Sequence, residues 1–363
     1  MTPSELARVL QGSELRPPQT LTIAVTGSCN LTCSHCWVEA GVPASNPHLP
    51  APSIHAIIDE FLLLGGTGIR FTGGEPLLHP DWLTFMTSAR DRGYRRLSLQ
   101  TNAMLLTDSW ANELKRLDFP GLSLEISLDG ATSSSHDQVR GKGAFCETLA
   151  GIKRLTRVGL SSRVTLFFTE MHHNLGELPD VLKLATELGV GAVASGALVR
   201  CGRAAGHGVN PATPEQYLQL LQRFKHDAEL NRLYDLLGST AAVEWWRNQA
   251  PRTECCTFVE NPYLTPAGTL YPCTLCHCND FSVTGVFRKG LTAAFKEGIP
   301  LWTSLSSISH SRSENLAECQ TCPEQTFCAG GCMGRAFGSH GELLTRDDRC
   351  NVRRAIGKEK KTR

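Results

Sequence analysis

The sequence predicts an α/β fold: a partial (β/α)6 TIM-like barrel followed by a small cysteine-rich α+β domain. Six strand–helix units occupy about 180 residues of the 363-residue chain, an alternation typical of a parallel sheet with helices packed outside it. A full barrel has eight such units, so two are missing before the composition changes. That change is the second observation, because ten of the fifteen cysteines fall between positions 255 and 350.

The first strand–helix unit begins after a polar lead-in. Residues 1–18 are expected to form a short helix and a linker, and the apolar run at 21–25 is predicted as the first strand. A loop with three cysteines and a turn-rich connection over 41–50 follow. The next helix is expected to begin near Ser53 as its N-cap, with apolar residues at helical spacing up to position 62.

The other five units repeat this alternation. Short runs of strand-forming residues predict strands at 68–72, 96–100, 122–127, 163–168 and 191–195. Helical spacing predicts helices at 82–92, 109–117, 145–158 and 178–188. In parallel barrels the chemistry lies at the C-terminal ends of the strands. The polar residues expected there are Cys29, Gly73, Thr101, Ser127 and Arg200.

The domain boundaries follow from these changes of composition. We expect a lead-in at 1–18, the barrel at 19–204, a helical connection at 205–250, the cysteine-rich domain at 251–352 and a solvated basic tail at 353–363. The cysteine-rich domain is expected to contain short strands and turns, including a hairpin over 263–271 with Gly268 in its turn. Metal sites are therefore expected near both ends of the chain, with a scaffold almost free of cysteine between them.

The overall charge excludes some partners. The chain has 36 basic and 35 acidic residues, so no net field attracts nucleic acid or an anionic membrane. The sequence shows neither a signal peptide nor an apolar run long enough to span a bilayer. A cytoplasmic location is expected, where disulfides are rare and clustered cysteines usually bind metal.

Three cysteines follow the first strand at the spacing C-x3-C-x2-C. Cys29, Cys33 and Cys36 bring three soft sulfur ligands together and supply no fourth. An iron–sulfur cube normally takes four cysteines, so this set leaves one iron open for another molecule. The alternative is a zinc knuckle, which requires C-x2-C pairs and a fourth ligand; only His35 lies nearby, inside the C-x2-C.

A glycine loop follows the second strand. Gly73 and Gly74 allow a close backbone approach, and Glu75 offers an acceptor for an ammonium group. With the cysteine motif, this loop resembles the radical S-adenosylmethionine (SAM) enzymes. The resemblance implies a 4Fe–4S cluster on the three cysteines, the methionine amino group of SAM on the loop, and Trp37 against the adenine.

Further motifs fit the same barrel. Thr101 and Asn102 end the third strand where the family has a Thr-Asn-Gly, although Ala103 replaces the glycine here. The Ser-Leu-Asp-Gly at 127–130 and the His-Asp-x2-Arg at 136–140 resemble the subgroup that modifies peptides. The resemblance implies SAM contacts from Thr101, Asn102, Ser127 and Arg140, the last two with its carboxylate. Asp129 either contacts the ribose or only caps the next turn.

The C-terminal cysteines resemble the SPASM domain, which carries two auxiliary 4Fe–4S clusters. The resemblance gives an outer cluster and an inner cluster, so the expected cofactors are SAM and three 4Fe–4S clusters. The outer ligands would be Cys319, Cys322, Cys328 and Cys350, and the inner ligands Cys273, Cys332 and either Cys255 or Cys256. Two alternatives stay open for the inner cluster: Cys276 or Cys278 completes it, or it keeps an open site for substrate. By spacing alone, Cys319 and Cys322 also fit a zinc ribbon.

The resemblance implies a radical SAM/SPASM oxidoreductase. Such an enzyme reductively cleaves SAM to a 5′-deoxyadenosyl radical, which removes hydrogen from a substrate C–H bond. We expect post-translational modification of a small peptide or protein: a crosslink, a thioether or a dehydrogenation. Sulfatase-maturating relatives carry an Asp where this chain has Thr274, which disfavours formylglycine formation. The alternatives are small-molecule biosynthesis (an aminosugar or tetrapyrrole/haem pathway) and, more remotely, a non-catalytic zinc-binding scaffold.

The expected mechanism also requires a source of electrons, a way to bind the substrate and groups that transfer protons. A reducing protein such as flavodoxin or ferredoxin is expected. About 20 residues precede the barrel, fewer than an N-terminal peptide-recognition domain needs, so a separate recognition protein is expected or the substrate is not a ribosomal peptide. Cys146 is expected to be a buried structural thiol. The candidate proton donors, each expected to be a solvated or structural histidine, are His35, His79, His136, His172 and His173.

Overall fold

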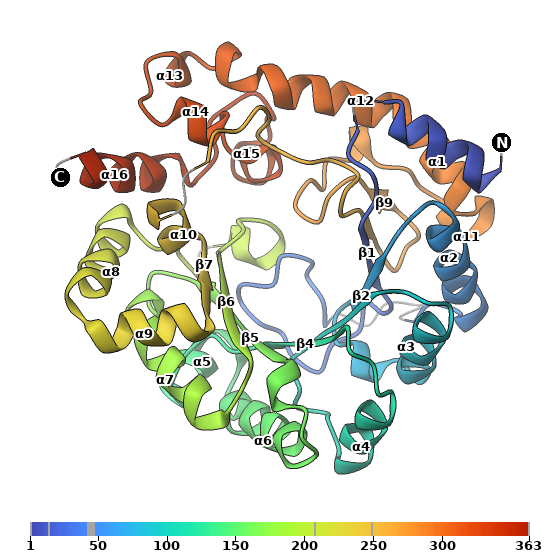
Figure 1. Cartoon of the computed structure of the whole chain (residues 1–363), viewed down its shortest axis with the longest axis horizontal. Coiled ribbons are helices and arrows are strands. Elements are labelled where there is room, and N and C mark those ends of the chain that lie inside the picture. Colours follow the sequence, from blue (N-terminus) through green and yellow to red (C-terminus); the bar gives the residue numbers. More distant parts are fainter. Residues whose placement is uncertain (1, 14, 42–47, 207, 248–249, 362–363) are drawn as a thin grey trace.

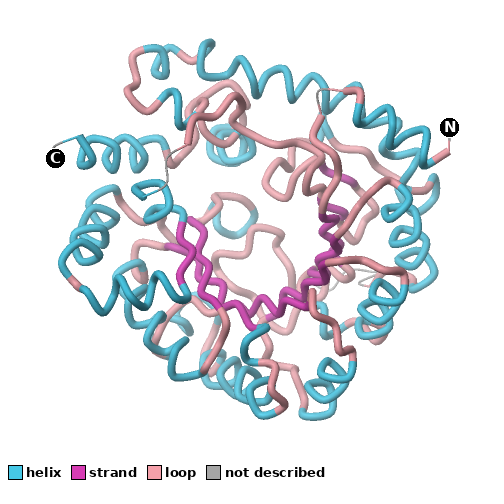
Figure 2. Tube along the Cα trace, viewed as in Figure 1, coloured by secondary structure: helices cyan, strands magenta, loops and turns pink. Residues whose placement is uncertain are grey.

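The barrel sheet contains nine strands in the order β7-β6-β5-β4-β3-β2-β1-β8-β9. The computed structural model describes residues 2–13, 15–41, 48–206, 208–247 and 250–361, so residues 42–47 of the expected 41–50 connection lie outside the described residues. The six predicted strands are β1 (Thr20–Ala24), β2 (Gly68–Thr72), β3 (Arg96–Thr101), β4 (Leu122–Ser127), β5 (Val164–Glu170) and β6 (Ala192–Ala197). They pair in parallel and curve into an open barrel (Figures 1 and 2). The partial barrel is therefore confirmed.

Helices cover the outer face of this sheet (Figure 1). They are α2 (Ala51–Leu63), α3 (Trp82–Asp91), α4 (Asp108–Arg116), α6 (Ala144–Arg157) and α7 (Leu178–Leu188). Helix α5 (Ser133–Arg140) follows β4 and contacts α6. On β3, Leu97 and Leu99 are buried beneath this layer, whereas Ser98 and Gln100 on the other face are half-buried. The same alternation along β2, β4 and β5 gives the barrel a polar inner face.

Two local expectations in the barrel differ from the structure. Helix α2 begins after Pro50 and no side chain caps it, so Ser53 is not its N-cap. Pro52 lies in the first turn of the helix, where the fixed φ of proline is favourable. Helix α5 was not predicted because its eight residues are mostly polar. Thr132 caps it by accepting the N–H of Ser135, and Gly141 ends it with a φ of 109°.

The connection between the two predicted domains adds a strand to the barrel. It contains α8 (Pro214–His226), α9 (Ala228–Leu237), β7 (Gly238–Thr240) and α10 (Ala241–Arg247), and β7 pairs in parallel with β6. The expectation of a purely helical connection is therefore wrong. At the opposite edge, β8 (Tyr263–Leu264) pairs in parallel with β1 and antiparallel with β9 (Leu270–Tyr271). The predicted hairpin is confirmed, and it joins the barrel sheet.

The rest of the cysteine-rich domain is mainly helical, so the expectation of short strands and turns there is wrong. Its helices are α11 (Val286–Lys289), α12 (Leu291–Asn315), α13 (Ala317–Gln320), α14 (Gln325–Cys328), α15 (Met333–His340) and α16 (Cys350–Lys361). In Figure 1 they complete the ring opposite the strands. The buried face of α12 mixes apolar residues with Ser306, Ser309 and Arg312, which conceals its helical period in the sequence.

Both terminal segments pack on the body of the protein. Helix α1 (Pro3–Gln11) contacts α2 and α12 and buries Leu6 and Leu10, as expected for a helical lead-in. Helix α16 contacts α8 and α10, and Ile356 is only 1% exposed. Residues 353–361 are therefore not the solvated tail that was expected. No helix in the described ranges combines the length and apolar character needed to cross a membrane.

Candidate functional site

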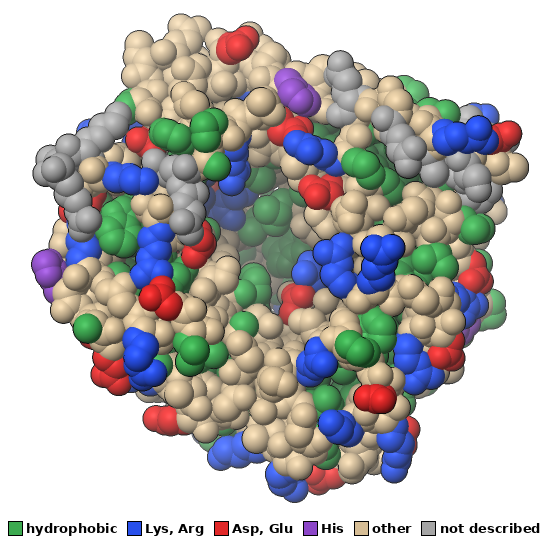
Figure 3. Space-filling view, in the orientation of Figure 1, with side chains coloured by type: hydrophobic (Ala, Val, Ile, Leu, Met, Phe, Trp, Pro, Cys, Tyr) green, Lys and Arg blue, Asp and Glu red, His purple; other side chains and the backbone are tan. Residues whose placement is uncertain are grey.

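A cavity of about 760 Å³ lies within the ring, between the barrel strands and the C-terminal helices. Figure 3 shows the hollow, with hydrophobic side chains in its depth and charged side chains at its rim. Residues predicted from both ends of the sequence line this one cavity. They are Cys29, Cys33, Cys36, Trp37, Gly73, Gly74, Glu75, Thr101, Asn102, Ser127, Arg140, Cys255, Cys328 and Cys332.

The first cysteine loop is held by an arginine that the sequence did not identify. Cys29, Cys33 and Cys36 all line the cavity, and Arg203 lies behind them in the short 3-10 helix η4 (Gly202–Ala205). Its guanidinium donates to the carbonyl oxygens of Cys33 at 2.8 Å and Ala40 at 2.7 Å. Charged donors of this kind fix a loop strongly. No motif marks Arg203, and Arg200, which was expected at this strand end, does not line the cavity.

The glycine loop packs directly on the segment that leads into Cys29. The N–H of Gly74 donates to the carbonyl of Thr26, and the N–H of Glu75 to that of Ser28, both at 2.8 Å. Gly73 has a φ of +150°, and a Cβ on Gly74 would collide with the carbonyl oxygen of Ser28. The glycines therefore allow two loops of the site to touch, a role separate from the ligand contact expected from the sequence.

Gly74→Ala is expected to separate these two loops. Overpacking against a backbone carbonyl typically costs about 1–3 kcal/mol, and here the displaced segment carries Cys29. The variant should have a lower urea midpoint and bind less iron on reconstitution. Gly27→Ala is the matched control, because a Cβ at Gly27 meets no atom within 4 Å. Equal iron content in the two variants would contradict this account of the loop.

Glu75 is a buried carboxylate held by uncharged donors. It is 1% exposed and accepts from the hydroxyl of Thr101 at 2.6 Å and the N–H groups of Asn102 at 2.9 Å and Leu77 at 3.1 Å. Burial raises its pKa, and these hydrogen bonds act in the opposite direction. A cation that reached the carboxylate would favour its ionised form. Thr101 and Asn102 thus position Glu75 as well as lining the cavity.

Arg140 is held in place from behind by Asp129. The Asp129 carboxylate is fully buried and accepts from Arg140 Nε at 2.6 Å and from the N–H of Thr169 at 2.8 Å, while His35 Nε2 lies 3.2 Å away. Burial alone would raise its pKa, but Arg140 and His35 hold the pKa of Asp129 well below its usual range. Arg140, His35 and Ser127 line the cavity, whereas Asp129 does not. This placement favours a supporting role for Asp129 over a ribose contact.

The pKa of His136 makes stability depend on pH. Its Nδ1 accepts the N–H of Asp129 at 3.1 Å, and burial lowers its pKa from 6.5 to about 4. Between these two values the unfolded chain binds more protons than the folded chain, so this contribution is complete above pH 6.5 and is lost as the pH falls towards 4. Between the two pKa values, one such group changes the free energy of unfolding by about 1.4 kcal/mol per pH unit.

His136→Gln is therefore expected to weaken the loss of stability on acidification. Urea midpoints measured at about pH 7 and about pH 5 should differ less in this variant than in the parent chain. His172→Gln is the control, because His172 is exposed. The same pH dependence in the parent and the His136 variant would contradict the assignment.

The other predicted histidines and Cys146 lie outside the cavity lining. Of the five candidate proton donors, only His35 lines the cavity. His79 is structural, because its ring contacts the carbonyl of Leu49 at 2.8 Å and accepts the N–H of Asp81 at 3.0 Å. Cys146 is exposed, so the expectation of a buried structural thiol is wrong.

Trp37 packs against aromatic rings of the C-terminal hairpin region. Its ring centroid is 5.6 Å from that of Tyr263 and 4.8 Å from that of His277. His277 in turn stacks on Tyr271 at 4.5 Å, and burial lowers its pKa to about 4. This cluster joins the first cysteine loop to the segment that carries Cys273, and sequence reasoning missed it because its members lie far apart in the chain.

The outer group of C-terminal thiols is assembled around α13, α14 and the start of α16. Burial raises the pKa of Cys319 to about 11, and the neighbouring thiols of Cys328, Cys350 and Cys322 add to this effect. Nearby Arg353 acts in the opposite direction on Cys328 and Cys350. Cys328, Cys350 and Cys322 therefore lie close enough to Cys319 to raise the pKa of its thiol.

The thiols of the inner group also lie close together, and both Cys255 and Cys256 are among them. Cys256 lies against Cys255 and Cys332, and its Sγ accepts the N–H of Met333 at 3.3 Å. Cys255 lines the cavity and its Sγ is 3.3 Å from the hydroxyl of Ser309. Burial raises the pKa of Cys273 to about 11, with a smaller contribution from Cys332. The remaining two thiols, Cys276 and Cys278, are 0% and 3% exposed.

These donors suit a cluster better than a single metal ion. Within the described part of the chain, no three histidine, cysteine or carboxylate side chains converge as a single-ion site. A tetrahedral zinc ion brings its sulfurs within about 4 Å of one another, because Zn–S bonds are about 2.3 Å long. An iron–sulfur cube holds each thiolate on a different iron. The thiols, the buried Glu75 carboxylate and the cavity-facing Arg140 fit a cluster together with a ligand that carries an ammonium and a carboxylate.

Comparison with known proteins gives a family match and relatives. The model of the radical SAM superfamily matches residues 23–185. The chain is 27% identical over 346 residues to the AdoMet-dependent heme synthase of Nitratidesulfovibrio vulgaris (strain Hildenborough), covering 91% of each chain. It is 26% identical to the mycofactocin maturase MftC of Mycobacterium ulcerans, covering 93% of this chain and 88% of that protein.

A solved structure shares the fold of nearly the whole chain. Streptococcus suis SuiB bound to the precursor peptide SuiA superposes with a TM-score of 0.71 at 16% sequence identity. The match covers 95% of this chain and 78% of SuiB, so it includes the C-terminal region as well as the barrel.

Proposed function

This chain belongs to the radical SAM superfamily, and from that premise we propose that it oxidises a C–H bond in a peptide or small protein. The observation that carries the proposal is the single cavity shared by the first cysteine loop, the buried Glu75 and the thiols of the C-terminal domain. A substrate in that cavity would lie near the thiols of the first cysteine loop and near those of the C-terminal domain. The product would be a crosslink, a thioether or a dehydrogenated residue.

The residues around the first cysteine loop are suited to hold the cluster and SAM. Cys29, Cys33 and Cys36 would ligate a 4Fe–4S cluster, Glu75 would accept from the SAM ammonium, and Arg140 would donate to its carboxylate. When bound, the cluster and SAM supply a 5′-deoxyadenosyl radical that removes a hydrogen atom from the substrate. The contribution of the protein is to position these groups and to exclude water from the cavity.

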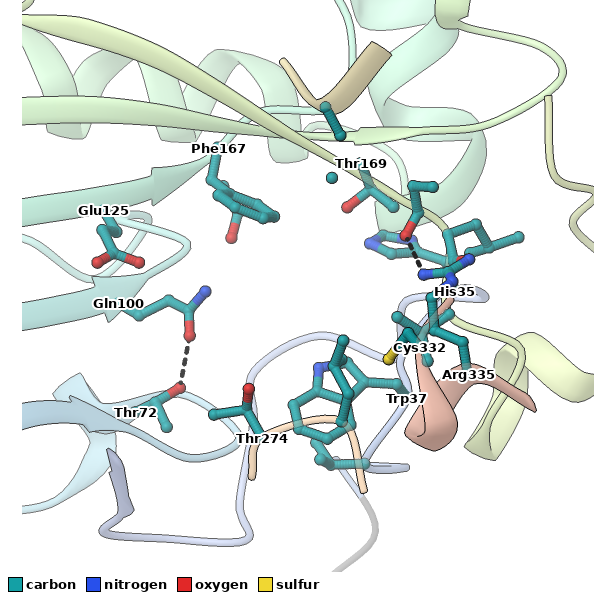
Figure 4. A pocket seen from close by; sticks show the side chains of 18 of the residues that line it. His35, Trp37, Thr72, Gln100, Glu125, Phe167, Thr169, Thr274, Cys332 and Arg335 are labelled. Atoms are coloured by element: carbon teal, nitrogen blue, oxygen red, sulfur yellow. Dashed lines mark hydrogen bonds between the residues drawn. The ribbon is translucent and has the colours of Figure 1, made fainter. Parts of the chain in front are cut away.

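The polar inner face of the barrel supports a peptide substrate. Figure 4 shows Thr72, Gln100 and Glu125 on neighbouring strands facing the cavity, with Thr72 donating to Gln100 at 3.1 Å. Arg70 donates through Nε at 3.1 Å and Nη2 at 2.9 Å to the same oxygen of Glu125. Among the described residues, the second oxygen of Glu125 has no such partner and can accept from a ligand. A peptide group, which has one donor and one acceptor, matches Glu125 and Gln100.

The C-terminal thiols would hold two further 4Fe–4S clusters, three in all. Cys319, Cys322, Cys328 and Cys350 are proposed as the outer ligands, a set supported by the effects of neighbouring thiols on the pKa of Cys319 and of Cys350. Cys273, Cys332 and Cys256 are proposed for the inner cluster. In this arrangement Cys255 faces the cavity beside it.

We also propose the compartment and the partners. All fifteen cysteines are free thiols, which suits the reducing cytoplasm. A flavodoxin or ferredoxin would supply the electron for SAM cleavage. A separate recognition protein would deliver the peptide.

A second candidate is a carboxylate-bearing tetrapyrrole. The haem synthase relative favours it, and so do the arginines that line the cavity. They are Arg70, Arg140, Arg203, Arg252, Arg335, Arg349 and Arg353. Most of these guanidiniums already pair with carboxylates, however: Arg335 with Asp348 and Arg349 with Glu170 are two examples. We therefore favour a peptide, because Gln100 and Glu125 on the inner face of the barrel match the acceptor and the donor of a peptide group.

The reconstituted enzyme distinguishes the two candidates. If a short peptide is encoded beside the gene, co-expression of the two should yield a peptide that has lost two hydrogens by mass spectrometry. Glu125→Gln should abolish this modification while uncoupled SAM cleavage continues, and Glu113→Gln on the surface should change neither. An unmodified peptide, together with SAM-dependent conversion of an added carboxylate-bearing tetrapyrrole, would overturn the peptide proposal in favour of the second candidate.

A further inference from the structure

A buried arginine lies beside each group of thiols, and each arginine is paired with an aspartate. Arg140 with Asp129 adjoins the first group and Arg335 with Asp348 the inner group. Arg353 adjoins the outer group and pairs with Asp347. The third pair differs from the Arg335–Asp348 pair in the hydrogen bonds that its aspartate makes.

Arg353 lies against the loop that joins the outer and inner groups. Its aspartate is 2% exposed, and Asp347 Oδ2 also accepts the N–H of Cys332 at 2.8 Å. A Cβ added to Gly331 would lie 2.5 Å from Arg353 Nη2 and 2.8 Å from Asp347 Oδ2. The guanidinium is therefore packed against the turn between Cys328 and Cys332, and it lines the cavity beside Cys328.

The charge of Arg353 is matched less completely than that of Arg335. Asp348 binds Arg335 through both of its oxygens, at 2.7 and 2.6 Å. Asp347 divides its oxygens between Arg353 and the backbone N–H groups of Cys332 and Arg349. The Nε of Arg353 is buried without a hydrogen-bond partner among the described residues. Each pair carries one positive and one negative charge, but Asp347 shares its oxygens with two backbone N–H groups, so it screens its guanidinium less than Asp348 does.

We propose that Arg353 raises the reduction potential of the outer cluster above that of the inner cluster. Reduction adds negative charge to a cluster, and an incompletely screened cation beside its thiolates stabilises the reduced form. At Arg335 the bidentate aspartate cancels most of this effect. This inference rests on the proposed function, because it requires clusters at the C-terminal thiols.

The position of the outer group fits the end of an electron path. Residues around Cys319 and Cys322 are exposed, including Glu318, Gln320 and Thr321. Cys255, beside the inner group, faces the cavity instead. A higher potential at the outer cluster would direct an electron from the cavity side towards the surface.

The test uses the full chain with Cys29, Cys33 and Cys36 changed to alanine, so that only C-terminal clusters form. After anaerobic reconstitution, the midpoint potential of each cluster is measured by a redox titration followed by electron paramagnetic resonance. Arg353→Gln is expected to lower the higher of the two potentials, Arg353→Lys to retain it, and Asp347→Asn to raise it. Arg346→Gln removes an exposed positive charge from the same segment and should change neither potential.

An electrostatic effect shifts the higher potential in opposite directions in Arg353→Gln and Asp347→Asn, whereas structural damage does not. If Arg353→Gln and Asp347→Asn leave the higher potential unchanged, or shift it in the same direction, the inference is overturned. Iron content identifies failure of its premise, because two clusters give about eight irons per chain. A parent protein without iron would overturn the proposed C-terminal clusters and this inference with them, whereas bound iron with unshifted potentials would overturn the inference alone.

Discussion

Cys33→Ala is expected to abolish SAM cleavage and to remove about four of about twelve irons per chain, because one of three cubane clusters can no longer form. The first cysteine loop supplies three thiols and no fourth, so loss of one leaves too few ligands to retain the cube. Arg203 also holds the carbonyl of Cys33, and burial raises the pKa of the Cys33 thiol while the positive charge of Arg140 acts in the opposite direction.

Iron analysis and release of 5′-deoxyadenosine measure the two parts of this prediction. Cys146→Ala is the matched control, since Cys146 is exposed and does not line the cavity. It should keep the full iron content and full SAM cleavage. Undiminished cleavage in the Cys33 variant would be incompatible with a cluster on this loop.

Asp129→Ala is expected to destabilise the fold by about 3–5 kcal/mol, because it leaves a buried charge without its partner. Arg140 would lose its carboxylate, and the N–H of Thr169 would lose its acceptor. The position of Arg140 in the cavity depends on the same contact, so SAM affinity should fall as well. Asp91→Ala is the control: it breaks an exposed pair with Arg90 and should cost about 0–1 kcal/mol.

The pH dependence of this contribution has a definite sign. Because the folded structure lowers the pKa of Asp129, the stabilisation is present above the ordinary carboxyl pKa of about 3.9 and is lost as the pH falls below it. Urea unfolding of the parent and variant near neutral pH measures the full difference. If the two midpoints agree there, Asp129 does not anchor Arg140.

The sequence was most informative where chemistry and periodicity coincide. Strands β2, β3 and β4 combine apolar residues facing the helices with Thr72, Thr101 and Ser127 at their C-terminal ends, so both the strands and their contribution to the site were predictable. The cysteine spacings likewise identified thiols that line one cavity. Parallel strands align these ends at one edge, which is why Cys29, Glu75, Thr101 and Ser127 come together although they span about 100 residues of sequence.

The sequence was least informative where function depends on side chains without a motif. No sequence motif marks Arg203, Arg335 or Arg353, because only the fold brings them next to the cysteine loops. Helix α12 was missed because Pro300 and several serines reduce its helical propensity, and tertiary packing on its buried face overrides this. The choice between Cys255 and Cys256 was undetermined for a similar reason, since adjacent residues differ only in the direction of their side chains.

Anaerobic reconstitution with iron and sulfide, followed by reduction in the presence of SAM, tests whether the three groups of thiols hold clusters and whether the first cluster cleaves SAM. We expect about twelve irons per chain from three 4Fe–4S clusters, together with release of 5′-deoxyadenosine. A colourless protein that binds only zinc, or an iron-loaded protein that releases no 5′-deoxyadenosine, would contradict this expectation.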